Sequence, residues 1–400
     1  MSSQTNQPQV RKRRVFYIPG YDPMPPRRYR ELYRSESQEQ ARISGYEIAI
    51  SPKSTEGRFG WCVTSDQDGQ IVESEFEVLV WSDIVRDSMS ASIPATYMQL
   101  ARTAWIYIST GTLWRLMRLR KGPVIAALYP VAMLVFQLLI ALAAAWACVA
   151  LAGWWGLIPG VAAAVALLSW FRKIDNRLFA YYLMHDYAYS AQLKGETSAE
   201  LRDRLASFRE TIDAALMSDV DEVLVVGHSS GAHLGVSVLA DLIRSKREPE
   251  AAVELSFLSL GQVVPMVSFL PQARELRSDL KFLSTCSDIT WVDVSAPGDG
   301  CAFALCDPVA VTGVAGADKL WPLVLSAAFT HTLSPERWKV LRWRFFRLHF
   351  QYLCAFDKPG SYDYFRITAG PLTLKHRFRD RSASRSRTET PVSKYTSVRP

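Results

Sequence analysis

The chain has 400 residues, which is enough for one large α/β domain with additions or for two domains. Hydrophobic residues make up 49% and charged residues 21%. The formal charge of +7 gathers at the two ends. The residues from Lys375 onward contribute +6 and the run from Arg11 to Arg14 contributes +4, so the residues between them carry −3. A slightly acidic body argues against a nucleic-acid-binding face, whereas basic ends fit anionic lipid headgroups or simply keep the protein soluble.

The cysteines exclude two further classes of protein. The six cysteines are scattered, with no CxxC pair and no paired histidines nearby, which is neither a zinc pattern nor a disulfide framework. We therefore expect no metal, no cofactor and a reducing compartment. The first 14 residues carry charge with no apolar stretch behind them, so the pattern predicts no cleavable signal peptide and an active domain that stays in the cytoplasm.

The first part of the chain reads as the start of an α/β domain. Residues 1–12 are polar and predict a disordered arm, and residues 13–121 predict the first part of the domain. Val15–Gly20 predicts a short buried strand that ends in a Pro-Gly turn, and a helix is expected after Pro25 and Pro26. Residues 46–84 contain three alternating runs, the last two joined by a turn at Asp66–Gly69 that predicts a hairpin.

Residues 122–171 contain no charged side chain. The stretch is broken near its middle by GWWG and by Pro159-Gly160, which predicts two membrane-spanning helices joined as a hairpin with two tryptophans at its tip. Basic residues stand on both flanks, so the positive-inside rule places both ends on the cytoplasmic side. Two alternatives stay open, namely a buried hairpin of a soluble domain and a re-entrant hairpin that inserts without crossing.

Residues 172–376 predict the second part of the domain. An aromatic segment, 178–192, is expected to lie along the membrane interface, and a helix capped by Thr197 or Ser198 leads into the strand at 223–226. Further strands are expected at 253–261 and 288–296, and one long helix at 334–353, capped by Ser334. Residues 377–400 are rich in Ser and Arg and predict a disordered basic tail.

The motif GHSSG, residues 227–231, carries the chemistry. A serine hydroxyl is a weak nucleophile, so it must stand free of bulky neighbours where backbone N–H groups converge. A sharp turn between a strand and a helix provides this, and Gly227 and Gly231 remove the Cβ atoms that would clash there. The apolar run before the motif and the helical pattern after it predict such a turn, with Ser229 as the nucleophile and His228 lining it.

In this context the sequence resembles the α/β-hydrolase fold, in its lipase and esterase branch. The resemblance implies a mostly parallel sheet flanked by helices, here with an inserted transmembrane helical hairpin. It also implies two backbone N–H donors for the oxyanion: that of Ser230, after the nucleophile, and one in the turn after an early strand. The stretch YIPGYDP occupies that turn with Pro19-Gly20 in place of the usual His-Gly, which makes Tyr21 the second donor.

The same resemblance implies the order serine, acid, histidine. The acid is expected in ITWVDVSAPGDG, where Asp299 lies in a loop past the strand and is preferred to Asp293 within it and to Asp307 beyond it. For the histidine, His331 has the usual loop placement and His376 lies near the tail. We favour His349, because FRLHFQYL followed by YDYFRITAGP is similar to segments of uncharacterised bacterial membrane-associated hydrolase-like proteins.

The sequence therefore predicts a serine hydrolase of the inner membrane that cleaves an acyl ester, possibly of a lipid, through Ser229, His349 and Asp299 and an acyl-enzyme intermediate. The catalytic domain and both termini are expected in the cytoplasm. Two alternatives remain open, a catalytically inactive hydrolase-fold scaffold and an acyltransferase. The expected partners are the membrane and the acyl substrate. No nucleic acid is expected, and the pattern points to no protein partner.

Overall fold

A single eight-stranded sheet forms the centre of the protein in a computed structural model that describes residues 10–53, 57–89, 92–245 and 253–398. The strand order is β2-β3-β4-β1-β5-β6-β7-β8. The strands β4, β1, β5, β6, β7 and β8 run parallel, while β3 is antiparallel to β2 and β4. Their bounds are β1 Lys12–Ile18, β2 Glu47–Pro52, β3 Gly60–Gln67, β4 Gln70–Val78, β5 Glu222–His228, β6 Glu254–Leu260, β7 Thr290–Ser295 and β8 Leu323–Ser326.

Helices cover both faces of the sheet, so the mostly parallel α/β class expected from the sequence is confirmed. One face packs against α9 (Ala199–Leu216), α10 (Gly231–Ser245) and α12 (Arg274–Thr285). The other face packs against α1 (Arg27–Ser44), η2 (Phe350–Leu353) and α17 (Tyr364–Ala369). Central parallel strands are buried on both faces, which explains the continuous apolar runs Val15–Ile18 in β1 and Val223–Val226 in β5.

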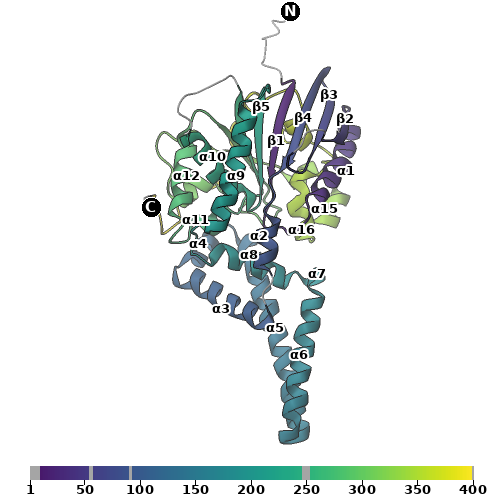
Figure 1. The fold of residues 1–400 in the computed structure, drawn as a ribbon, viewed down its shortest axis with the longest axis vertical. Coiled ribbons are helices and arrows are strands. Elements are labelled where there is room, and N and C mark those ends of the chain that lie inside the picture. Colours follow the sequence, from purple (N-terminus) through teal and green to yellow (C-terminus); the bar gives the residue numbers. More distant parts are fainter. Residues whose placement is uncertain (1–9, 54–56, 90–91, 246–252, 399–400) are drawn as a thin grey trace, which may run out of the picture.

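The remaining helices lie around these layers (Figure 1). They are α2 Ser82–Ser88, α3 Ile93–Ser109, α4 Thr112–Leu119, α5 Lys121–Ala152, η1 Gly153–Gly156, α6 Leu157–Lys173, α7 Asp175–Leu178, α8 Ala180–Ala191, α11 Val264–Ser268, α13 Pro308–Thr312, α14 Phe329–Thr332, α15 Pro335–Leu341, α16 Phe345–His349 and α18 Leu374–Arg377.

The apolar stretch is a long helical projection from one end of the body (Figure 1). Helices α5 and α6 are separated by η1 and run side by side. They pack so closely that a Cβ atom on Gly160 would lie 2.8 Å from the carbonyl oxygen of Ala145. The stretch Lys121–Lys173 is long and apolar enough to cross a membrane, and few of its residues are buried inside the protein. Strands from both sides of this stretch, β1–β4 and β5–β8, belong to the same sheet.

The expected long helix at 334–353 is wrong in detail, because the chain forms three short elements there, α15, α16 and η2. The break falls at Arg342–Arg344, where all three side chains are exposed. The bend turns Leu348 and His349 inward, where both are buried. Tertiary packing thus overrides a strong helical pattern.

Helix α8 also departs from its expected role. The aromatic segment was expected to lie along the membrane interface, but α8 packs inside the protein through one buried face that includes Ala180, Met184 and Ala188. Its neighbours are α3 and α5 rather than solvent. Its aromatic side chains are therefore part of the core that joins the projection to the sheet.

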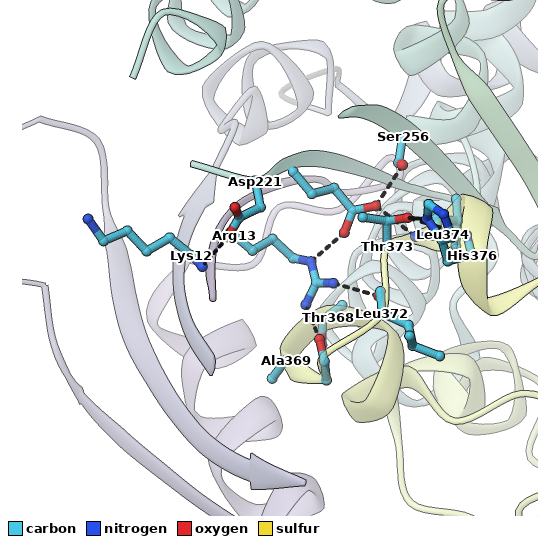
Figure 2. A network of polar contacts seen from close by, with 12 residues as sticks. Lys12, Arg13, Asp221, Ser256, Thr368, Ala369, Leu372, Thr373, Leu374 and His376 are labelled. Atoms are coloured by element: carbon cyan, nitrogen blue, oxygen red, sulfur yellow. Dashed lines mark hydrogen bonds and ion pairs between the residues drawn. The ribbon is translucent and has the colours of Figure 1, made fainter. Parts of the chain in front are cut away.

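The basic run Arg11–Arg14 lies in and beside β1, at the end of the sheet opposite the projection, and acidic residues neutralise most of it (Figures 1 and 2). Lys12 pairs with Asp219 at the surface, and Arg14 pairs with Glu77. The Arg13 guanidinium is fully buried, with its Nε 2.6 Å from Oε2 of Glu222. This run therefore supplies little free charge for lipid headgroups.

Main-chain carbonyls complete the Arg13 site (Figure 2). Arg13 donates to the carbonyl oxygens of Gly370 and Leu372, while Glu222 accepts from the Ser256 hydroxyl and the Leu374 N–H. A buried ion pair is tolerated only when its remaining hydrogen-bonding capacity is satisfied in this way. The pair ties β1 to β5 and to the segment that precedes α18.

The C-terminal segment, for which composition predicted no fixed structure, lies against the body as far as it is described. The Thr388 N–H donates to the Leu305 carbonyl, and the Val392 N–H donates to that of Val311. Arg277 donates from its Nε to the carbonyl of Ser397. The segment thus covers the loop after β7 and the end of α13. Residues 1–9 of the expected N-terminal arm lie outside the described residues.

We expect Arg13→Met to lower the free energy of unfolding by about 3–5 kcal/mol, because it leaves the Glu222 carboxylate buried without its cation. Adding Glu222→Leu should recover a large part of the loss, since no uncompensated charge then remains. Chemical denaturation of the detergent-solubilised protein would measure both effects. Lys12→Met, which breaks only an exposed pair, is the control and should leave the unfolding midpoint unchanged. A single variant as stable as the unaltered chain would contradict this role for the pair.

Candidate active site

Ser229 occupies the turn between β5 and α10. Its φ of 55° lies in the left-handed region, which is strained for a residue with a Cβ atom. The Ser229 N–H donates to the carbonyl of Leu260 at 2.9 Å, which ties the turn to the end of β6. Ser229 is half-buried, whereas His228 and Ser230 on either side of it are buried. The serine predicted from the GHSSG motif thus lies on a sharp, strained bend at the carboxyl end of a central strand.

Three glycines allow the chain to pack around this turn. A Cβ atom on Gly227 would lie 2.6 Å from the carbonyl oxygen of Gly231, and one on Gly231 would lie 2.1 Å from that of Ile18. A Cβ atom on Gly20 would lie 2.9 Å from the Cβ atom of Ser229. Real Cβ atoms do not approach so closely, so each position requires glycine. The end of β1 can therefore pass directly beside the serine.

The two expected oxyanion donors belong to the segments that adjoin Ser229. A Cβ atom on Gly20 would lie 3.4 Å from the Ser229 hydroxyl oxygen, and Tyr21 follows Gly20 in the chain. Ser230 follows the serine at the start of α10. Within the described part of the chain, neither the Tyr21 N–H nor the Ser230 N–H donates a hydrogen bond to another protein group. Both N–H groups are therefore available to an oxygen held beside Ser229.

Asp299 and His349, 50 residues apart in sequence, form a buried pair. Nδ1 of His349 lies 2.7 Å from Oδ2 of Asp299. The same carboxylate accepts hydrogen bonds from the Cys301 N–H and the Tyr352 hydroxyl. Burial alone would raise the pKa of Asp299, but the charge of His349 and these three hydrogen bonds outweigh it and hold the pKa below its usual value. Asp299 is therefore ionised and fixes the orientation of the imidazole.

The His349 imidazole lies over the ends of β5 and β6, beside the serine turn. Its ring centroid is 4.7 Å from that of His228, and Nε2 of His228 lies 3.0 Å from the His349 carbonyl oxygen. A Cβ atom on Gly261, which follows the Leu260 that binds the Ser229 N–H, would lie 3.1 Å from Cε1 of His349. Nε2 of His349 is buried and has no hydrogen-bond partner among the described residues. A buried nitrogen without a partner is uncommon, and here it lies next to the turn that holds the serine.

His228 holds this arrangement in place rather than titrating in it. Burial lowers the pKa of His228 to about 3, so its ring is neutral. Because a carbonyl only accepts hydrogen bonds, Nε2 of His228 must carry the proton that it donates to the His349 backbone. The residue before the serine thus positions the backbone of the histidine, a link that no feature of the sequence indicated beyond its place in the motif.

The other candidates are not part of this cluster. Asp293 accepts from the Ser259 hydroxyl within the sheet. Asp307 caps α13 and pairs with Lys319. His331 is exposed on α14, and His376 bonds to Thr373 near the opposite end of the sheet. The structure therefore brings together Asp299 and His349, the pair preferred from the sequence, and separates the alternatives from them.

Asp299, Cys301 and His349 also offer ligand atoms within 4.8 Å of one another, a spacing that suits a metal ion. Two of these groups suit a metal poorly. Burial raises the pKa of the Cys301 thiol well above its usual value, and a metal needs the thiolate. The Asp299 oxygens already accept three hydrogen bonds. The contacts fit an oriented imidazole better than a metal centre.

A cleft borders the site on the side of α8 and α9. Tyr21 and Ser230 line it, together with Asp186 of α8 and His233 of α10. No hydrogen bond to the Asp186 carboxyl is found among the described residues, and burial raises its pKa to about 7, an effect that the nearby His349 opposes. Sequence reasoning missed Asp186 because it placed α8 on the membrane surface. The carboxyl lines the same cleft as Tyr21 and Ser230.

Comparisons of this chain with protein-family models, with curated proteins and with solved structures found no match. The assignment of a function therefore depends on the geometry of the site.

We expect Asp186→Asn to stabilise the protein more as the pH rises. The pKa of Asp186 is higher in the folded than in the unfolded chain. The unfolded chain therefore releases this proton first, and the folded protein loses stability as the pH rises from about 4 towards 7. The amide does not titrate, so relative to the unaltered chain the variant should gain roughly 2–3 kcal/mol between pH 5 and pH 8. Unfolding midpoints at the two pH values would measure this gain. Asp203→Asn on the exposed face of α9 is the control, and an equal response of the two variants would contradict the burial effect.

Proposed function

We propose that the protein is a membrane-anchored serine hydrolase of the α/β-hydrolase type that cleaves acyl esters. One observation carries the proposal: a buried imidazole, oriented by an ionised carboxylate, leaves its second nitrogen without a partner beside a serine on a strained bend. An imidazole held in this way is suited to accept a proton from a hydroxyl. The two free N–H groups next to the serine support the same reaction, because acyl transfer needs donors for a developing oxyanion.

In the proposed reaction, Nε2 of His349 takes the proton of the Ser229 hydroxyl while the Ser229 oxygen attacks the carbonyl carbon of the ester. The N–H groups of Tyr21 and Ser230 hold the negative oxygen of the tetrahedral intermediate. The imidazolium then protonates the leaving alcohol, and an acyl-enzyme remains. Water, deprotonated by the same nitrogen, then attacks the acyl group. The bond between the acyl carbon and Ser229 breaks, the imidazolium returns its proton to the Ser229 oxygen, and the carboxylic acid leaves. Asp299 stays ionised throughout, because its pKa is held low, and stabilises the imidazolium.

Anchoring through α5 and α6 is the second part of the proposal. Large apolar side chains face outward along both helices, including Leu139, Trp146 and Val161, and two exposed tryptophans stand at the tip, Trp154 and Trp155. A soluble protein does not leave a surface of this size uncovered. Basic residues flank both roots, which supports a transmembrane hairpin with the sheet and both termini in the cytoplasm of an inner membrane.

The site lies at the roots of this hairpin. A Cβ atom on Gly122, at the start of α5, would lie 3.4 Å from the Cα atom of Gly300, which follows Asp299. At the other root, the ring of Phe179 packs 4.6 Å from that of Phe346 on α16, the helix that carries His349. An ester that resides in the bilayer would therefore meet the serine close to the membrane, which supports a lipid as the substrate class.

We expect a fluorophosphonate probe to label the protein and Ser229→Ala to abolish the labelling, since the probe reacts only with an activated serine. Ser230→Ala is a matched control, because it removes the neighbouring hydroxyl and keeps the backbone N–H. Gel fluorescence of the detergent-solubilised protein would measure the labelling. A folded, unaltered chain that stays unlabelled would contradict the hydrolase and favour an inactive scaffold.

We expect His349→Ala and Asp299→Asn each to lower kcat by about 10⁴-fold on a short-chain p-nitrophenyl ester, with little change in KM, because both residues act on the transition state. The double variant should be about as slow as either single one, since the two side chains act as a unit. His331→Ala, at the exposed alternative histidine, should retain full activity. Loss of activity in His331→Ala with retention in His349→Ala would transfer the role to His331.

A further inference from the structure

The end of the body that surrounds α5 and α6 carries exposed apolar side chains on both sides of the helical stem. On one side, α3 presents a stripe of Met98, Trp105 and Ile108, which are 71%, 71% and 51% exposed. On the other side, the segment from α15 to α16 presents Val340, Trp343 and Phe345, which are 55%, 71% and 48% exposed. Figure 1 shows α3 and α16 at the end of the body from which the two long helices project. We call these six side chains the stem-side surface.

The packing of α3 determines which of its residues point outward. Residues 98, 105 and 108 follow helical spacing along one face, while Thr103, Ile106 and Tyr107 point inward and are buried. The Tyr107 hydroxyl donates to the Met266 carbonyl, which fixes the rotation of α3 about its axis. The outward face is therefore held apolar by the packing of the inward one.

The two segments that carry the stem-side surface contain basic residues and no acidic ones. Residues 93–121 contain five Lys or Arg and no acidic residue, and residues 337–350 also contain five basic residues and no acidic one. In the second segment, Lys339, Arg342, Arg344 and Arg347 are all exposed. Exposed tryptophans interleaved with arginines are the composition of segments that lie in the headgroup region of an anionic bilayer.

We propose that the stem-side surface lies on the bilayer that α5 and α6 enter, so that α3 and residues 339–347 rest among anionic lipid headgroups. This inference rests on the anchoring in the proposed function and goes beyond it, because a hairpin alone would leave the body free to stand away from the membrane. Three observations favour a bilayer over a protein partner: the surface lies at the end of the body from which the apolar stem projects, it flanks the stem on both sides, and the segments that carry it are basic, which complements anionic lipid.

The proposal has a consequence for the site. Trp343 and Phe345 belong to the segment that leads into His349, and a Cβ atom on Gly300 would lie 3.3 Å from the ring of Phe345. Lipid that contacts residues 339–347 would therefore contact the short segment that leads into His349 and packs against the loop of Asp299.

Site-specific photocrosslinking tests the proposal on the full chain. Benzoylphenylalanine would replace Trp105, Trp343, Trp154 at the tip of the stem, or Met217, which is 62% exposed near the opposite end of the sheet. The protein would be reconstituted in nanodiscs of phosphatidylcholine with or without about 30% phosphatidylglycerol. We expect lipid adducts at positions 105, 343 and 154, and at least about fivefold fewer at position 217. Mass spectrometry of the irradiated protein would count them.

Paired variants that neutralise arginines test whether the basic charge attracts the anionic lipid. Arg342→Gln with Arg344→Gln should remove most of the gain in adducts that anionic lipid produces at position 343. Arg379→Gln with Arg381→Gln, two exposed arginines just beyond α18, is the charge-matched control and should leave that gain unchanged.

The outcomes separate the two proposals. Adducts at 154 without adducts at 105 and 343 would show a body that stands away from the membrane and would overturn the stem-side surface alone. Crosslinks from 105 or 343 to a second protein chain would replace the bilayer by a protein interface. An absence of lipid adducts at 154 would overturn the anchoring and, with it, this inference, while fluorophosphonate labelling would still report on the hydrolase.

Discussion

The close approach of β1 to the turn at Ser229 is the constraint on which the rest of the site depends. Three positions without a Cβ atom, Gly20, Gly227 and Gly231, let a loop from the first strand pass beside the serine while α10 begins at once behind it. This contact brings Gly20, and Tyr21 after it in the chain, to the turn that holds Ser229 and Ser230. The bend itself is strained, because Ser229 has a φ of 55°.

Much of the fold follows from local sequence. The continuous apolar runs of β1 and β5 predicted strands buried on both faces, and the turn residues before Gly69 predicted the hairpin of β3 and β4. The serine turn was also predictable, because its glycines are required by the backbone path rather than by side-chain packing. The preference for Asp299 and His349 agrees with the pair that the structure forms, although the histidine was chosen on a resemblance and not on a physical argument.

The parts that the sequence did not reveal depend on tertiary contacts. Residues 334–353 have strong helical spacing, yet burial of Leu348 and His349 breaks the helix at Arg342–Arg344. The aromatic pattern of α8 looks the same whether it meets lipid or protein, so neither its buried position nor the carboxyl of Asp186 in the cleft could be inferred. The basic run near the N-terminus pointed to lipid, whereas its partners Glu222, Glu77 and Asp219 lie far away along the chain.

The position of β1 between β4 and β5 has a consequence for biosynthesis. Arg13 and its partner Glu222 are separated by 209 residues, and the apolar stretch Lys121–Lys173 lies between them. A ribosome therefore releases the entire stem before the strand that completes the centre of the sheet has been made. Until β5 emerges, one edge of β1 lacks its neighbour, and pairing over so long a separation is slow. The second half of the sheet must then fold on a nascent chain whose long apolar segment has already been translated.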